Sequence, residues 1–304
     1  MNDDKKKNKF FLFLNYFSYS MIFFVLSKSL FSLVITWELL GLTSFFLITH
    51  YENNKSLKSG ISAFLMNRLS DLFITLIILI IIIYDNDQFI IENNKLNSNI
   101  NIFFAISLVI ASFIKSAQFV FFKWLPDSME APLPASALIH SATLVSAGIF
   151  LLIKYNFFFK NIYLISIFLI ISITSAVFFS LISAFQTDVK KALAYSTIAN
   201  CSFIYSLIFS KNFDNAIIYF SIHGFFKSLV FIIFGYAIIV YKHKQDIRNW
   251  NNIFNHNNKI ILLVIIPIIC LGALQISPVY FFKSQFNYNY IDNKVLYYFY
   301  FIMV

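Results

Sequence analysis

The sequence predicts an all-α polytopic membrane protein. Of its 304 residues, 59% are hydrophobic and only 12% are charged, and the mean hydropathy is +0.75. Soluble domains are about 45–50% apolar and about 25% charged, so this chain has too little polar surface to cover its core in water. The second observation is a series of apolar runs of about 20 residues, the length that crosses a bilayer as a helix. Together they exclude a soluble globular fold, a disordered chain and a nucleic-acid-binding protein.

Nine such runs and the start of a tenth follow a polar cap over residues 1–9. The expected spans are 10–27, 30–50, 61–84, 102–122, 133–153, 160–185, 191–210, 216–241 and 259–282, and a last run begins near Val295. Ten helical residues rise only about 15 Å. We therefore expect the chain to end inside the membrane, as a truncated or divided protein would.

Basic residues orient these spans. Lysine and arginine concentrate in the loops on the side that holds Met1, and the positive-inside rule places that side in the cytoplasm or the matrix. The loops on that side hold Lys5, Lys6, Lys7, Lys9, Lys55, Lys58, Lys123, Lys190, Lys191, Lys242, Lys244, Arg248 and Lys259, against Lys28, Lys95, Lys154, Lys160, Lys211 and Lys294 on the other. The net charge of +9 thus indicates basic loops.

Four ionisable residues lie where a membrane helix should be apolar. They are Glu38 in LVITWELLGLTSFFLI, Lys115 in SLVIASFIKSAQFVFF, Lys227 in IIYFSIHGFFKSLVFII and Lys283 in PVYFFKSQF. A charge at the bilayer centre costs about 2.5–3.5 kcal/mol on insertion scales, so these residues are candidates for function. The alternatives are a lysine that extends to the headgroups, a structural ion pair or, for Glu38, a packing hydrogen bond.

Two histidines add to these charges. His223 and Lys227 are four residues apart and share a helix face. His140 lies in PASALIHSATLVSAGIF, whose small residues let helices approach closely. A neutral imidazole both donates and accepts, so it can pass a proton, although an isolated histidine is more often a helix-to-helix hydrogen bond. Carboxylate, lysines and histidines together favour a polar path.

Other charged residues have supporting positions. Arg68 and Asp71 are three apart just inside a span, which favours a structural ion pair. Asp127 belongs to WLPDSMEAPLP, whose prolines interrupt any helix, so we expect a sharp re-entry between two spans. Asp188 is expected to cap the helix that follows it. The sequence holds no Gly-rich phosphate loop and no cysteine cluster, so we expect no cofactor and no metal in this chain.

One long stretch carries a specific resemblance. Ile114–Gly148, IKSAQFVFFKWLPDSMEAPLPASALIHSATLVSAG, is similar to the signature of the antiporter-like proton-pumping subunits of respiratory complex I, and among these to the subunit 5 group. Further motifs follow in that family's order between Thr36 and Arg248: TWELLGLTSFFLI, NRLSD, QTDVKKALAYSTIA, HGFFKSLVF and QDIR. Multisubunit cation/proton antiporters share much of this pattern.

The resemblance implies a fold of two inverted five-helix repeats, over 10–153 and 154–304, each with a helix broken at a lysine. Aligned by motif, the chain opens at the family's fourth helix, which starts on the matrix side, and stops in its thirteenth. We therefore expect a split subunit whose missing N- and C-terminal helices are supplied by separate chains.

The resemblance also implies roles. Glu38 matches the acidic partner of Lys115, the first broken-helix lysine, and His140 matches the proton relay of the next helix. Lys227 matches the central lysine, with His223 beside it. Two positions depart from the family: Tyr219 stands where a second histidine is frequent, and LGALQISPVYFFKSQF, around the second broken-helix lysine Lys283, lacks the family's Gly- and Pro-rich approach.

The function so implied is proton translocation within NADH:ubiquinone oxidoreductase. NADH, FMN, iron–sulfur clusters and ubiquinone are expected in other subunits of the complex. Partners would be the other membrane-arm subunits, especially the neighbouring antiporter-like subunit, and membrane lipids. The location would be the mitochondrial inner membrane, with the N-terminus on the matrix side. Three alternatives stay open: a sodium or potassium/proton antiporter subunit, a structural subunit with an inert channel, and a haem carrier bridged by His140 and His223.

Overall fold

The computed structural model describes residues 6–84, 98–141, 143–159, 161–240 and 244–250, together with Pro267. Within these residues the regular structure is helical, without a strand. The chain separates into two compact units, one of Met1–Ala135 with Thr143–Ile162 and the other of Ser136–Ala142 with Tyr163–Val304. The predicted division into repeats over 10–153 and 154–304 stays a prediction.

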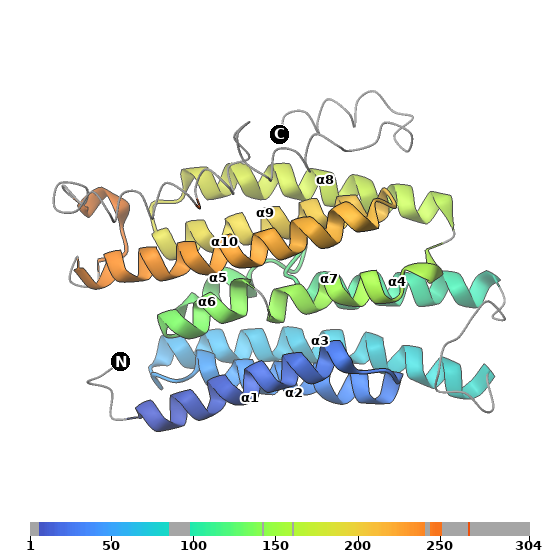
Figure 1. Ribbon diagram of the computed structural model, residues 1–304, viewed down its shortest axis with the longest axis horizontal. Helices are drawn as coiled ribbons and strands as arrows, with labels where there is room; N and C mark the ends of the chain where they lie inside the picture. Colours follow the sequence, from blue (N-terminus) through green and yellow to red (C-terminus); the bar gives the residue numbers. More distant parts are fainter. Residues whose placement is uncertain are drawn as a thin grey trace. The chain divides into compact units, whose positions relative to one another are not determined.

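The first unit is built on helices that pack in chain order (Figure 1). Helix α1 packs on α2, α2 on α3, α3 on α4 and α4 on α7. On α1, Phe10, Phe17 and Phe24 repeat every seven residues and are buried, since that spacing returns to one helix face. The elements are α1 (Lys7–Leu26), α2 (Leu30–Ile48), α3 (Asn54–Tyr84), α4 (Ser98–Lys115), α5 (Trp124–Asp127), η1 (Ser128–Glu130), α7 (Leu144–Lys154) and η2 (Asn156–Phe158).

Helix α4 ends at Lys115, so the expected helix over 102–122 is wrong beyond that residue. The chain closes there in a Schellman turn, in which the Gln118 N–H donates to the Phe113 carbonyl at 2.8 Å and the Ala117 N–H to Ile114 at 3.2 Å. Ala117 has a φ of 53°, a left-handed conformation that glycine usually supplies. The prolines of WLPDSMEAPLP then allow only the short elements α5 and η1, as expected.

A lysine joins the last helix of this unit to the first. Lys154, the final residue of α7, donates from Nζ to the backbone carbonyl of Ser27, which follows the last turn of α1, and to its Oγ at 3.2 Å. The lysine thereby satisfies one of the carbonyl groups that a helix end leaves without a partner.

The second unit contains three long helices and part of a short one. They are α6 (Leu133–Ser141, from Ser136 on), α8 (Ile162–Phe185), α9 (Val189–Phe209) and α10 (Phe213–Val240), with η3 (Ile247–Asn249) after them. α9 packs on α10, and ring contacts between Phe168 and Phe209 join α8 to α9. Asp188 and Asp246 pair as an isolated β-bridge that ties the start of α9 to the segment after α10.

Seven stretches of the described helices are long and apolar enough to cross a membrane. They are Lys7–Leu26, Leu30–Ile48, Asn54–Ile80, Leu133–Lys154, Ile162–Phe185, Val189–Phe209 and Phe213–Val240, and Asn101–Lys115 is a shorter apolar helix. The stretch predicted as one helix over 133–153 contains two, because Thr143 between α6 and α7 is not helical. The predicted ninth span, the run after Val295 and Lys283 lie outside the described residues. The chain is a multi-pass membrane protein.

Candidate functional site

Lys115 is fully buried in the first unit, at the last residue of α4. Its ammonium donates to the backbone carbonyl of Trp37 at 3.1 Å and lies 4.6 Å from the centre of the Trp37 ring. A ring face and a carbonyl oxygen both attract a cation. The ammonium of Lys115 therefore makes its direct contacts with neutral groups of α2.

Polar side chains of α2 and α3 surround this contact. The Trp37 indole donates to Ser70 Oγ at 3.2 Å, and Ser70 donates to the Asn67 carbonyl at 2.7 Å. The carboxamide oxygen of Asn67 is buried and has no hydrogen-bond partner among the described residues. Native structures rarely leave such an atom unpaired without a functional reason, so this buried polar row is a candidate site.

Arg68 lies close to Glu38 and Asp71, two of the carboxylates that the sequence analysis names in the first unit. Its guanidinium lies 3.4 Å from Asp71, the ion pair that the spacing predicts, and 3.7 Å from Glu38. Asp71 is buried, and its Oδ1 has no hydrogen-bond partner in the part of the chain that the structure describes, whereas the Glu38 side chain is 40% exposed. The implied direct pairing of Glu38 with Lys115 is not what the structure contains, because Lys115 binds the backbone of the preceding residue, Trp37, instead.

Lys227 is the buried lysine of the second unit, 1% exposed on α10. Its ammonium lies 2.5 Å from Ser196 Oγ of α9. Asn200, one turn further along α9, donates to the Ser196 carbonyl at 2.7 Å and accepts a hydrogen bond from the Tyr219 hydroxyl at 2.7 Å. Tyr219 is thus linked to Lys227 through two α9 residues.

Both histidines of the prediction are buried in the second unit. His223 lies one turn before Lys227, and its buried Nε2 has no hydrogen-bond partner within the described ranges. His140 stacks on Phe231 of α10, with ring centres 5.6 Å apart. Tyr219, His223, Lys227 and Phe231 recur every four residues, so α10 presents them on one face. A buried imidazole and a lysine bound to a hydroxyl can exchange protons with each other through water.

The remaining predicted residues lie at helix ends. Asp188 occupies the N-cap position of α9, but its side chain makes no capping hydrogen bond and instead lies 3.4 Å from Lys191, so that prediction is wrong in its contact. Beside it, hydrogen bonds from Arg248 lower the pKa of Asp246. Asp127 ends α5 on an exposed position.

Sequence reasoning missed Trp37, Ser196 and Asn200. The two α9 residues are four apart, and polar residues at that spacing in an apolar helix share a face, so they could have been found beside Lys227. Trp37 could not, because its contacts with Lys115, through the backbone carbonyl and the ring, join two different helices and follow from no spacing along one helix.

Comparisons with known proteins identify the family of this chain. The family described as NADH:quinone oxidoreductase/Mrp antiporter, TM, matches residues 27–303. NADH-ubiquinone oxidoreductase chain 5 of Paramecium tetraurelia is 39% identical over 300 residues, which are 94% of this chain and 52% of that protein. The chain 5 of Anopheles arabiensis is 34% identical over 82% of this chain and 65% of that one.

A solved structure agrees with the sequence relatives. A chain of the Mrp complex from Dietzia sp. DQ12-45-1b is 28% identical, with a TM-score of 0.71 over 75% of this chain and 26% of that one. The chain spans about half the length of the curated relatives it matches. It belongs to the NADH:quinone oxidoreductase/Mrp antiporter family of membrane proteins.

Proposed function

We propose that this chain translocates protons across a membrane as a non-redox subunit of an NADH:ubiquinone oxidoreductase. The observation that carries the proposal is that two lysines, Lys115 and Lys227, are buried among apolar helices and bound to neutral oxygens rather than to carboxylates. Such a lysine can lose its proton without leaving a buried carboxylate unpaired. NADH, FMN, iron–sulfur clusters and ubiquinone belong to other subunits in this proposal, and their redox energy drives transport.

Arg68 is the group that we propose couples Lys115 to that energy. It lies within 4 Å of both Glu38 and Asp71, whereas Lys115 makes its hydrogen bond to the Trp37 carbonyl and not to either carboxylate. A small movement that brings one of them from Arg68 to Lys115 stabilises the ammonium, and its return favours release of the proton. Moving one charge against 100 mV costs about 2.3 kcal/mol, an amount within reach of a single gained or lost ion pair in a buried site.

In the second unit, we propose that Lys227 passes its proton to the groups on its own helix face. Ser196 Oγ both accepts and donates, and His223 has a buried Nε2 within one turn of Lys227. His140 and Lys283 complete the path implied by the family resemblance, and Asp127 and Asp188 support it at the helix ends.

The test replaces each lysine separately. Lys115→Ala and Lys227→Ala should abolish NADH-driven proton uptake by membrane vesicles, measured with a fluorescent pH probe. NADH oxidation by an artificial acceptor and the size of the assembly on a native gel should stay unchanged. Lys211→Ala, at an exposed position, is the matched control. Normal proton translocation in either buried-lysine variant would contradict the path and favour a structural subunit with an inert channel.

A second candidate is a subunit of a sodium or potassium/proton antiporter. The likeness to the Mrp complex, with a TM-score of 0.71, favours it. Transport by such a protein depends on the cation supplied and proceeds without NADH. Proton movement that continues in the absence of NADH and scales with sodium or potassium concentration would support this candidate over the first.

We place the chain in the mitochondrial inner membrane with its N-terminus on the matrix side. Two features support the placement: chain 5 relatives from eukaryotes, and the excess of lysine in the loops on the Met1 side. Its partners would be other membrane-arm subunits, the neighbouring antiporter-like subunit above all. Protease protection of a tag before Lys6 in intact organelles without their outer membrane tests the orientation.

A further inference from the structure

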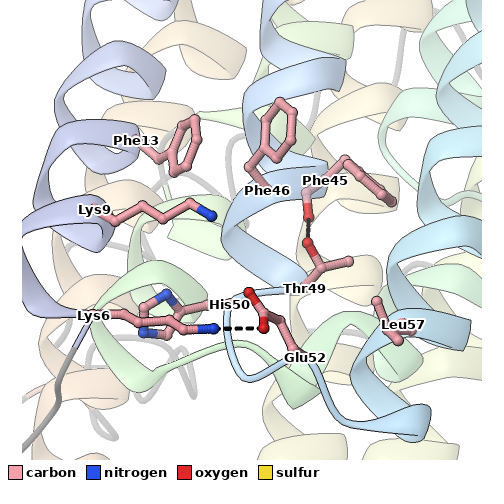
Figure 2. A pocket seen from close by; sticks show the side chains of 9 residues that line it. All are labelled: Lys6, Lys9, Phe13, Phe45, Phe46, Thr49, His50, Glu52 and Leu57. Atoms are coloured by element: carbon pink, nitrogen blue, oxygen red, sulfur yellow. Dashed lines mark hydrogen bonds and ion pairs between the residues drawn. The ribbon is translucent and has the colours of Figure 1, made fainter.

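A cavity of about 230 Å³ lies at one end of the first unit, apart from the buried lysine site. It is formed where α1 begins, α2 ends and α3 begins (Figure 2). Its lining is polar at one end and aromatic at the other. The residues are Lys6, Lys9, Phe13, Phe45, Phe46, Thr49, His50, Glu52 and Leu57.

The polar end carries an excess of positive charge. Lys6 Nζ lies 2.5 Å from Glu52 Oε2, and the charge of Lys9 also acts on that carboxylate, so among the described lining residues two ammonium groups face one carboxylate. Figure 2 shows Lys9 extending from α1 toward α2, above this ion pair. His50 lines the same end. Its ring lies edge-on to the Phe10 ring, with ring centres 5.1 Å apart. An anion placed here would meet Lys9 directly and Lys6 beside it.

The other end is apolar and aromatic. Phe13 of α1 and Phe46 of α2 stack with ring centres 4.7 Å apart and planes 11° from parallel. Phe45 and Leu57 complete this wall, and Phe46 is 42% exposed. Rings this accessible at the edge of a membrane bundle offer a surface for hydrocarbon.

Helices α1, α2 and α3 are each able to cross a membrane, and the cavity lies where all three change from apolar to polar sequence. That level of a bundle meets lipid headgroups, and lysines with aromatic rings are typical of it. We propose that the cavity binds one anionic phospholipid, with its phosphate on Lys9 and its first acyl carbons against Phe13 and Phe46. A zwitterionic lipid has no net charge to match the lysine and should bind more weakly.

Glu52 sets the strength of this site in our proposal. Its carboxylate neutralises Lys6, and the hydrogen bond and charge of that lysine lower the pKa of Glu52, so it stays ionised at neutral pH. Replacing it by glutamine frees a second ammonium for the phosphate. Removal of the Glu52 charge should therefore strengthen binding of the anionic lipid.

The experiment titrates the purified native assembly that contains the chain with short-chain phosphatidylglycerol in a phosphatidylcholine–detergent background and reads bound lipid by native mass spectrometry. Lys9→Gln should weaken phosphatidylglycerol binding about fivefold, the loss expected for one basic residue near an anionic surface. Phe46→Ala should weaken it as well, and Glu52→Gln should strengthen it by a similar factor. Lys58→Gln, an exposed lysine of α3 outside the cavity, is the matched control and should bind as the wild type does.

Three results would overturn the proposal. An equal loss of phosphatidylglycerol affinity in Lys9→Gln and Lys58→Gln would mean that the lipid responds to the general surface charge and that the cavity is no specific site. Binding of phosphatidylcholine as tight as that of phosphatidylglycerol would mean an uncharged hydrocarbon contact. Displacement of the lipid by an equal concentration of inorganic phosphate would mean a free-phosphate site. The thermal unfolding midpoint of each variant separates these results from misfolding, and the gain in Glu52→Gln cannot arise from misfolding.

Discussion

Gly60 of α3 faces the end of α2 so closely that a single methyl group there should destabilise the first unit. A Cβ at this position would lie 2.3 Å from Thr49 Cγ2 and 3.5 Å from the Phe45 ring. The ring distance is an ordinary contact, so the conflict is with one methyl group. Thr49 does not turn away freely, because its hydroxyl donates to the Phe45 carbonyl at 2.9 Å.

The magnitude follows from two opposing effects. Overpacking of this kind costs about 1–3 kcal/mol. Alanine in place of glycine in a helix interior gains about 0.5–1 kcal/mol. Gly60→Ala should therefore lower the free energy of unfolding by about 1 kcal/mol in the wild type. In a Thr49→Ser background, which keeps the hydroxyl and removes the methyl, the same change should raise it by about 0.5–1 kcal/mol.

The assay is a double-mutant cycle on the detergent-solubilised protein, with unfolding followed by tryptophan fluorescence. The cycle removes the cost of Thr49→Ser alone and isolates the coupling, expected at about 1–3 kcal/mol. Gly41→Ala is the matched control, because its Cβ would meet Asn67 Cβ at a tight 3.3 Å and not Thr49, so its effect on stability should be the same in both backgrounds. An effect of Gly60→Ala with the same sign and size in both backgrounds would refute the reasoning.

Three further predictions concern surface and network positions. Lys211, exposed at a φ of 61° where α9 ends, holds a conformation that glycine adopts freely, so Lys211→Gly should raise the unfolding free energy by about 0.5–1 kcal/mol in chemical denaturation. Tyr219→Phe leaves the Asn200 carboxamide without its donor and should lower stability by about 1–3 kcal/mol in the same assay, whereas Tyr219→His should lower it less. The pKa of Glu52 is lowered, so its ion pair with Lys6 stabilises the fold fully above the ordinary value of 4.5 and is lost as pH falls through the lowered value. The thermal unfolding midpoint should therefore decrease more from neutral to acid pH in the wild type than in Glu52→Gln. An equal decrease in both proteins would contradict the ion pair.

The sequence predicts a helix where a long apolar run has polar residues at both ends. It does not predict a helix end that lies inside an apolar run. The expected span 30–50 became α2 (Leu30–Ile48) because polar residues mark both its ends. Helix α3 starts at Asn54, seven residues before the expected 61, because Lys55 and Lys58 continue the helix into the polar layer. The stop at Lys115 was hidden because Ala117 takes the place of the glycine that signals such a turn.

For the candidate site, spacing along one helix was informative and pairing between helices was not. The buried face of α10 follows from residues four apart, and the Arg68–Asp71 pair follows from residues three apart. Whether Glu38 meets Arg68 or Lys115 depends on how α2 is rotated against its neighbours, which apolar sequence on all sides of a helix does not specify.

The lysine that ends α7 has a consequence for the order of synthesis. It donates to the end of α1 across 127 residues of chain. A membrane protein is inserted from its N-terminus as the ribosome elongates it, so α1 enters the bilayer long before its last carbonyl finds this donor. Helices α1 to α4 can therefore pack on one another in chain order, whereas the Ser27 carbonyl receives this donor only after α7 has emerged. A crosslink between positions 27 and 154 should form in chains stalled well after Lys154, once α7 has left the ribosome, and its absence there would contradict the contact.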